Sequence, residues 1–179
     1  MPFETDSITV RRRDDDEWTV VGDLVYHGKV DRFVVPDGFR TDFATVPRVV
    51  VWLIPRFGRY TLAAVLHDWL CTDGIRSGTV TSREADGIFR RAMRELDVPV
   101  ARRWLMWTGV RWAALRNPLR RPGWAFSAPG VLAITALAAP VVVPPALLIL
   151  AALAVYGVVE RLVSPRAGSG PLDTGSLRT

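Results

Sequence analysis

The chain has 179 residues, a formal net charge of +5 and one cysteine. A single cysteine excludes an internal disulfide framework and a four-cysteine zinc site, so folding does not require an oxidising compartment. The positive charge favours an acidic partner, either nucleic acid or an anionic membrane surface, and the length allows one domain plus an appendage.

Short strands are expected over residues 1 to about 47. The segments SITVRRR, EWTVVGDLVYHG and DRFVVPDGF are rich in β-branched and aromatic residues, and glycine-containing turns interrupt them. The sequence Pro36-Asp37-Gly38 is a turn signal, because proline presets φ and glycine accepts a positive φ. This pattern predicts a small antiparallel meander.

Three helices are expected next. The first runs from Arg59 to about Cys71. The second can be capped by Thr81 or Ser82, and Thr81 can form a capping box with Glu84 before apolar residues at helical spacing. The third covers the tryptophan-rich sequence VARRWLMWTGVRWAALRN. Residues 1–121 are therefore predicted to form an α+β domain, in which a small N-terminal antiparallel sheet packs on about three helices.

Residues 122–163 are the most apolar part of the chain, with no charged residue between Pro122 and Val159. One membrane span needs roughly 20 residues, so this length predicts a helical hairpin that crosses a membrane twice and turns at the sequence PVVVPP. Arginines flank both ends, so the positive-inside rule would place both termini in the cytoplasm. The alternatives are a buried hairpin of a soluble protein, an apolar tail bound to another protein, and a single kinked span. Residues 164–179 are small and polar and are expected to be disordered.

Four ionisable residues lie where apolar patterning would not place them, namely Asp42, His67, Asp68 and Asp86. His67 and Asp86 border the apolar stripes of successive helices and would face each other if these helices pack antiparallel. An imidazole oriented by a carboxylate can accept a proton from water, so His67 and Asp86 form the candidate catalytic pair. Asp42 and Asp68 are candidate ligands for a hard cation such as calcium, which would stabilise an oxyanion.

Each of these residues also has a structural explanation. Asp42 could close an Asx turn, and His67 could bond a backbone carbonyl in the core. The other two carboxylates could form ion pairs with nearby arginines, Asp68 with Arg59 or Arg83 and Asp86 with Arg90. In a second structural version, the His-Asp pair and Asp86 form a buried polar network that locks two helices together.

Three motifs resemble those of a known family. The stretches VPDGFRTDFATVPR, AAVLHDWLC and SREADGIFRRAMRELDV are similar, in order and spacing, to the domain-of-unknown-function family number 1353, which is common in tailed phages and prophages. The resemblance covers about residues 20–112. Thr45 stands where the family usually has serine, and Cys71 where it usually has tyrosine. The resemblance implies a phage-encoded protein and no particular activity.

The His-Asp pair with a later aspartate also resembles the site of prokaryotic phospholipase A₂. That resemblance implies that His67 is the base, Asp68 a calcium ligand and Asp86 the group that orients the histidine. Asp42 would supply the second ligand from the upstream loop. The chain lacks the glycine-rich calcium loop flanked by cysteines and the disulfides of those enzymes.

Two functions follow from these features. The first is a non-enzymatic phage component, either a virion protein of the minor-tail type or a membrane-associated accessory protein. Its partners would be other virion proteins or host membrane lipids, and it would reside in the virion or the host inner membrane. The alternative is a membrane-attached, metal-assisted hydrolase of envelope lipids or esters. Nucleic acid is not the expected partner, because the arginines lie beside tryptophans and near the apolar segment, without a nucleic-acid-binding motif.

Overall fold

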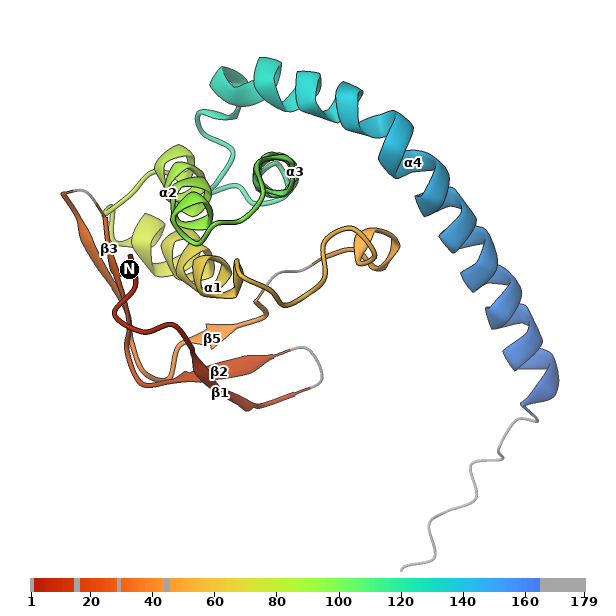
Figure 1. The fold of residues 1–179 in the computed structure, drawn as a ribbon, viewed down its shortest axis with the longest axis horizontal. Coiled ribbons are helices and arrows are strands. Elements are labelled where there is room, and N and C mark those ends of the chain that lie inside the picture. The colour runs from red at the N-terminus through yellow and green to blue at the C-terminus, as the bar shows by residue number, and fades with distance from the viewer. Residues whose placement is uncertain (1, 15–16, 29, 44–45, 165–179) are drawn as a thin grey trace, which may run out of the picture.

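The computed structural model describes residues 2–14, 17–28, 30–43 and 46–164 (Figure 1). Its N-terminal part contains two small antiparallel sheets, one with the strand order β1-β2-β5 and one that pairs β3 with β4. The strands are β1 (Thr9–Arg12), β2 (Trp18–Val21), β3 (Leu24–His27), β4 (Arg32–Val35) and β5 (Arg40–Thr41). The expected meander is thus divided into two sheets.

Two glycine corners set the directions of these strands. Gly22, between β2 and β3, has a φ of 81°, and Gly38, between β4 and β5, has a φ of 79°. Other residues would be strained in this left-handed region. The carboxylate of Asp37 accepts a hydrogen bond from the Gly22 backbone at 2.7 Å, and that of Asp23 accepts one from the Asp37 backbone at 2.9 Å. The corners therefore stabilise each other and bring β5 against the first helix.

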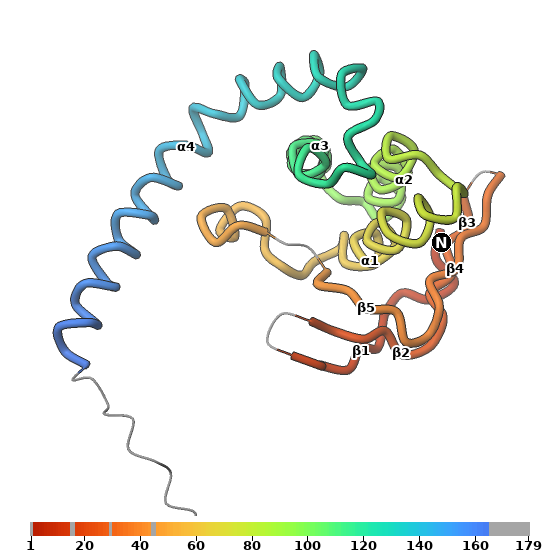
Figure 2. Tube along the Cα trace, turned by 180° about the vertical axis from the view of Figure 1, so that it is seen from behind, coloured from red at the N-terminus to blue at the C-terminus, as the bar shows by residue number. Residues whose placement is uncertain are grey.

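The helices α1 (Thr61–Trp69), α2 (Ser82–Glu95) and α3 (Val100–Ala114) follow the strands. A short 3₁₀ turn, η1 (Arg48–Val50), precedes α1, and a π-helical turn, η2 (Leu70–Gly74), extends it. α1 contacts β4, β5 and α2, whereas α3 contacts α2 and α4, and Figure 2 shows this order from the opposite side. Apolar residues of sheets and helices share one core, which includes Tyr26, Val35, Leu66 and Met93. The predicted α+β class is confirmed.

The apolar C-terminal segment is one helix, α4 (Trp124–Val163), of 40 residues. The predicted hairpin is therefore absent from this segment. The prolines at 129, 140, 144 and 145 lie inside the helix and do not end it. Proline removes one backbone hydrogen bond and bends a helix, and a chain turn would require further residues with non-helical geometry. Figure 1 shows α4 as a continuous arc. Disorder was predicted for residues 164–179, and all of these residues except Ser164 lie outside the described part of the chain. Thr45, one of the positions that differ from the family pattern, also lies outside it.

The two halves of α4 have different surroundings. The first half packs on α3 and η1, with Val131 fully buried. The second half, residues 144–163, exposes large apolar side chains such as Leu148 and Leu162. At 1.5 Å per residue the whole helix is about 60 Å long, roughly twice the thickness of the hydrocarbon of a bilayer. Within the described residues, α4 is the one helix that is long and apolar enough to cross a membrane.

The predicted capping box at the start of α2 is present and can be tested by mutation. Glu84 accepts a hydrogen bond from the Thr81 backbone at 2.7 Å, and the Thr81 hydroxyl accepts one from the Glu84 backbone at 3.3 Å. Thr81→Ala should lower the free energy of unfolding by about 1 kcal/mol, because the helix loses its N-cap. Thr79→Ala, outside the helix, should have a smaller effect in the same denaturant titration. Equal losses would contradict the role of the cap.

Candidate functional site

A fully buried carboxylate, that of Asp86, is the centre of the polar network. Asp86 lies on α2 and accepts hydrogen bonds from three basic side chains. The donors are His67 Nε2 at 2.6 Å, Arg111 Nη1 at 2.8 Å and Arg120 Nη2 at 2.7 Å. His67 comes from α1, Arg111 from α3, and Arg120 from the turn that follows α3. One negative charge therefore joins three helices and the start of the connection to α4.

Arg111 extends this network to α4. Its side chain is fully buried, and its Nε donates to the hydroxyl of Ser127 at 2.9 Å. Its backbone carbonyl accepts a hydrogen bond from the indole of Trp124 at 2.7 Å. Ser127 and Trp124 lie in the first turn of α4. The base of the apolar helix is thus attached to Asp86 through a single arginine.

The structure brings His67 and Asp86 together, as the helical spacing predicted, and their catalytic roles stay predictions. The His67 ring contacts Phe89 in a tilted arrangement, with centroids 4.6 Å apart and an angle of 32° between the ring planes, and the Cys71 sulfur lies 3.3 Å from the same Nε2 that contacts Asp86. Burial lowers the pKa of His67, but Cys71 and the Asp86 carboxylate oppose this effect, and the net result is a pKa raised above its usual value of 6.5. The direction rests on Asp86, because Cys71 contributes only when its sulfur is anionic. A raised pKa favours imidazolium, which cannot act as a base.

Asp68 and Asp42 lie at one end of a pocket. Asp68 Oδ2 accepts a hydrogen bond of 2.5 Å from the Thr41 hydroxyl, which in turn accepts one of 2.9 Å from the Phe43 backbone. Burial, and then the nearby Asp42 carboxylate, raise the pKa of Asp68 from 3.8 to about 7. Two carboxylates that disfavour each other's charge would be stabilised by a cation, so this pair fits the predicted calcium ligands chemically. Asp42 is exposed and Asp68 is half-buried.

A second group of ligand-type atoms is less suited to a metal. One atom each from His67, Cys71 and Asp86 lies within 4.8 Å of the others. Two guanidinium groups, those of Arg111 and Arg120, already contact the Asp86 carboxylate. They neutralise its charge and would repel a divalent cation. The geometry also excludes a catalytic triad of the usual form, because Asp86 and Cys71 contact the same imidazole nitrogen.

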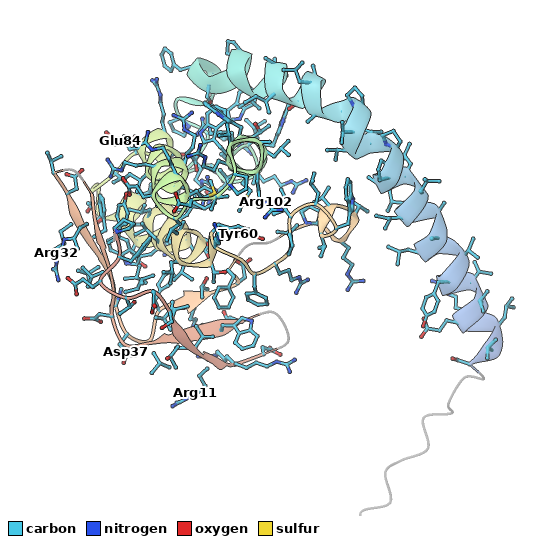
Figure 3. The ribbon with its side chains drawn as sticks, in the orientation of Figure 1. Arg11, Arg32, Asp37, Tyr60, Glu84 and Arg102 are labelled. Carbon is cyan, nitrogen blue, oxygen red and sulfur yellow. The ribbon has the colours of Figure 1, made fainter. Side chains whose placement is uncertain are left out.

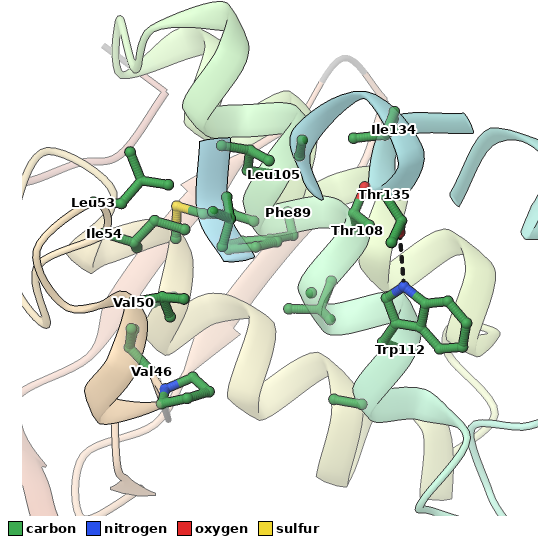
Figure 4. Close-up of a pocket in the computed structure, with 18 of the residues that line it drawn as sticks. Val46, Val50, Leu53, Ile54, Phe89, Leu105, Thr108, Trp112, Ile134 and Thr135 are labelled. Carbon is green, nitrogen blue, oxygen red and sulfur yellow. Dashed lines mark hydrogen bonds between the residues drawn. The ribbon is translucent and has the colours of Figure 1, made fainter. Parts of the chain in front are cut away.

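The pocket has a volume of about 470 Å³ and is lined mainly by apolar side chains from η1 and the residues after it, α3 and α4 (Figure 4). His67, Asp68, Asp42 and Arg120 are among its lining residues. The Trp112 indole donates to the Thr135 hydroxyl at 3.0 Å and connects two of the walls. The Thr108 hydroxyl is buried in the lining without a hydrogen-bond partner. Because Nε2 of His67 is engaged by Asp86, Nδ1 is the ring nitrogen that does not contact this carboxylate.

Sequence reasoning missed Arg111 and Arg120, which hold Asp86 in place of the expected Arg90. Arg90 instead lies over the ring of Trp104, with 4.2 Å from the guanidinium carbon to the ring centroid. A signal for Arg111 does exist, because it lies between Thr108 and Ala114, both buried, on one stripe of α3. An arginine in such a stripe indicates a buried counter-ion.

Loss of the central charge should strongly destabilise the protein. Asp86→Asn keeps the side-chain size but leaves Arg111 and Arg120 buried without their counter-ion, which should cost about 3–5 kcal/mol of unfolding free energy. Asp73→Asn, at an exposed position of η2, is the control and should change little. Denaturant unfolding of the full chain in detergent measures both. A loss below about 1 kcal/mol for Asp86→Asn would contradict the network's structural role.

The raised pKa of Asp68 predicts how stability depends on pH. The folded state binds the proton of Asp68 more tightly than the unfolded state, so this contribution is complete below pH 3.8 and is lost as pH rises through about 7. Asp68→Asn mimics the protonated acid. The midpoint of thermal unfolding of this variant, relative to wild type, should therefore be higher at pH 8 than at pH 5. A difference that does not change with pH would show that Asp68 has an ordinary pKa.

Comparison with known proteins identifies the family of the chain. A family model described as "Protein of unknown function (DUF1353)" matches residues 18–110, which is more than half of the chain. No curated protein and no solved structure matches. The matched region contains Asp42, His67, Asp68 and Asp86, but ends before Arg111, Arg120 and α4. The chain belongs to the DUF1353 family of proteins of unknown function.

Proposed function

We propose that this chain is a membrane-associated, non-enzymatic phage component whose domain is held at the host inner membrane by α4. The observation that carries the proposal is the chain of contacts from Asp86 through Arg111 to Ser127, at the base of a helix whose second half exposes large apolar side chains and has no charged residue before Glu160. A large exposed apolar surface on a monomer indicates contact with a membrane or another protein. The phage origin is supported by the family resemblance of the three motifs.

The chemistry of the network favours a structural lock over catalysis. A general base must be neutral before it accepts a proton, whereas the contact with Asp86 favours the cationic form of His67. Asp86 is also shared with two arginines, so it is not available to orient the imidazole alone. These features suit a rigid connection between the domain and its apolar helix.

A single helix implies a different topology from the one expected for a hairpin. If α4 crosses once, the domain and the residues after α4 lie on opposite sides of the membrane. Three arginines, at 116, 120 and 121, precede α4, whereas two, at 161 and 166, lie at and after its end. The positive-inside rule therefore favours a cytoplasmic domain and a C-terminus on the other side.

Membrane anchoring can be tested in cells that express the full chain. The protein should remain in the membrane fraction after carbonate washing and dissolve only in detergent. Leu148→Arg combined with Leu153→Arg should release part of it, since a charge at the centre of a span costs roughly 3 kcal/mol. Val30→Arg, at an exposed turn of the domain, should have no effect. Recovery of the wild type in the soluble fraction without detergent would contradict anchoring.

A hydrolase is the second candidate, and the pocket is the observation that favours it. An apolar pocket with convergent polar groups and shifted pKa values is typical of an active site. Neutral His67 would take a proton through Nδ1 from a water that attacks an ester carbonyl, and Asp86 would hold Nε2. Asp42 and Asp68 would hold a cation such as calcium, which supplies charge stabilisation when bound.

Calcium and His67→Ala separate the two candidates. The structural lock predicts that His67→Ala lowers the unfolding midpoint of the full chain and that ester and phospholipid hydrolysis is absent from the wild type. The hydrolase predicts that calcium stabilises the wild type, by about 2.7 kcal/mol at one hundred times its dissociation constant, and does not stabilise Asp68→Asn. Hydrolysis that disappears in a stably folded His67→Ala variant would replace the lock with the hydrolase.

A further inference from the structure

Residues 46–57, hereafter the 46–57 loop, are mostly apolar, yet they touch the core at few points: Ile54 packs against it, and the Phe57 ring makes an edge contact with the buried Phe43, with centroids 5.1 Å apart. Their sequence is VPRVVVWLIPRF, and η1 lies within it. Each of the twelve side chains is at least partly exposed. Trp52 is 47 % exposed and Phe57 is 54 % exposed. Two prolines, Pro47 and Pro55, bound the apolar run and restrict the backbone at both of its ends. The apolar side chains between them are not fully buried within the domain.

The loop lies beside α4. η1 contacts α4, and Val50, Leu53 and Ile54 line the same pocket as the α4 residues 138–143 (Figure 4). Figure 1 shows the loop projecting from the α1 side of the domain toward the concave side of α4. It therefore meets α4 immediately before the exposed half of the helix begins.

The charges of this region have one sign. Arg48, Arg56 and Arg59 lie in or next to the loop, and residues 46–60 contain no aspartate or glutamate. Tryptophan and arginine beside an apolar surface are typical of the headgroup level of a membrane. A protein partner could also cover an apolar loop, but a wholly basic rim next to a membrane-length helix favours anionic lipid.

The length of the exposed half of α4 indicates where along the helix a bilayer would begin and end. Residues 144–163 extend about 30 Å at 1.5 Å per residue, which equals the hydrocarbon thickness of a typical bilayer. If this half crosses the membrane, the bilayer begins near residue 143, where the loop contacts the helix. Tyr156, which is exposed, would lie about 20 Å further along the helix, toward the opposite interface.

We propose that the 46–57 loop is a second membrane-contact element, which inserts Trp52 and Phe57 at the headgroup level of an anionic bilayer where α4 enters it. The inference rests on the proposed anchoring by α4. The loop and the helix would together fix the depth and tilt of the domain, and would place the open side of the pocket next to lipid.

Fluorescent labels at single positions test this arrangement in the full chain. Cys71 is buried, so introduced thiols can be labelled at Trp52→Cys, at Leu148→Cys in α4, and at Val30→Cys on a remote turn of the domain. The proteins are reconstituted in vesicles of phosphatidylglycerol and phosphatidylcholine that contain brominated lipids, with labelled wild type as the blank. We expect strong quenching at position 148, quenching by bromines close to the headgroup at position 52, and none at position 30.

The outcomes separate the two proposals. Quenching at 148 without quenching at 52 would overturn the membrane role of the loop and leave the anchor intact. Absence of quenching at both positions would overturn the anchor and, with it, the loop. Phe57→Cys provides a second position in the loop. The two replacements remove different contacts, namely the hydrogen bond from the Trp52 indole to the Val49 carbonyl and the edge contact of Phe57 with Phe43, so quenching at both positions would not depend on either loss.

A charge variant tests the preference for anionic lipid. Arg48→Gln with Arg59→Gln should reduce quenching at position 57 by at least twofold in phosphatidylglycerol vesicles. The matched control is Arg11→Gln with Arg32→Gln, which removes the same charge on the side of the domain away from α4 (Figure 3). Equal reductions in the two variants would show that net charge, and not the loop, attracts the lipid.

Discussion

The buried carboxylate of Asp86 is the constraint on which the helical part of this protein depends. A charge in the core is costly unless it is paired and fully hydrogen-bonded, and Asp86 meets that condition with His67, Arg111 and Arg120. The same condition restricts the partners, because three basic groups gathered in the interior would repel one another without the carboxylate. The four side chains come from α1, α2, α3 and the following turn, so the helices can pack only in the arrangement that brings them together. An intact buried ion pair of this kind adds little net stability, but loss of one partner is costly because the other charge is then left buried and unpaired.

This network also explains why an apolar helix is attached firmly to a polar domain. Arg111 donates hydrogen bonds to Asp86 and to Ser127. Asp86 lies in the region that the family model matches, so Arg111 connects this region to α4, which lies outside it. The first half of α4 then covers α3 and η1, and the second half stays free. Under the proposed anchoring by α4, a domain attached in this way would have a defined orientation relative to the membrane, and the 46–57 loop would lie at the level where the membrane begins.

Much of the domain could be predicted from the sequence. The capping box of Thr81 and Glu84 and the apolar stripe that follows it predicted α2 and where it begins. The spacing of His67 and Asp86 on their helices predicted the contact between them. Arg111 was missed although it lies on one stripe of α3 with Thr108 and Ala114, and Arg120 could not be assigned, since an arginine in a flanking turn is ordinarily solvated. The prediction of a helical hairpin in the apolar segment was wrong because it treated the prolines of the sequence PVVVPP as the end of a helix. Instead, α4 continues through all four prolines as a curved helix.

The central claim is that Asp86 and Arg111 act as one structural unit, and a double-mutant cycle tests it most directly. The free energy of unfolding would be measured for the wild type, Asp86→Asn, Arg111→Gln and the double variant. The account predicts that the loss of unfolding free energy in the double variant is smaller than the sum of the two single losses. The difference should be about 1.5 kcal/mol or more, because the two residues share a buried ion pair. Losses that add within about 0.5 kcal/mol would contradict a direct coupling.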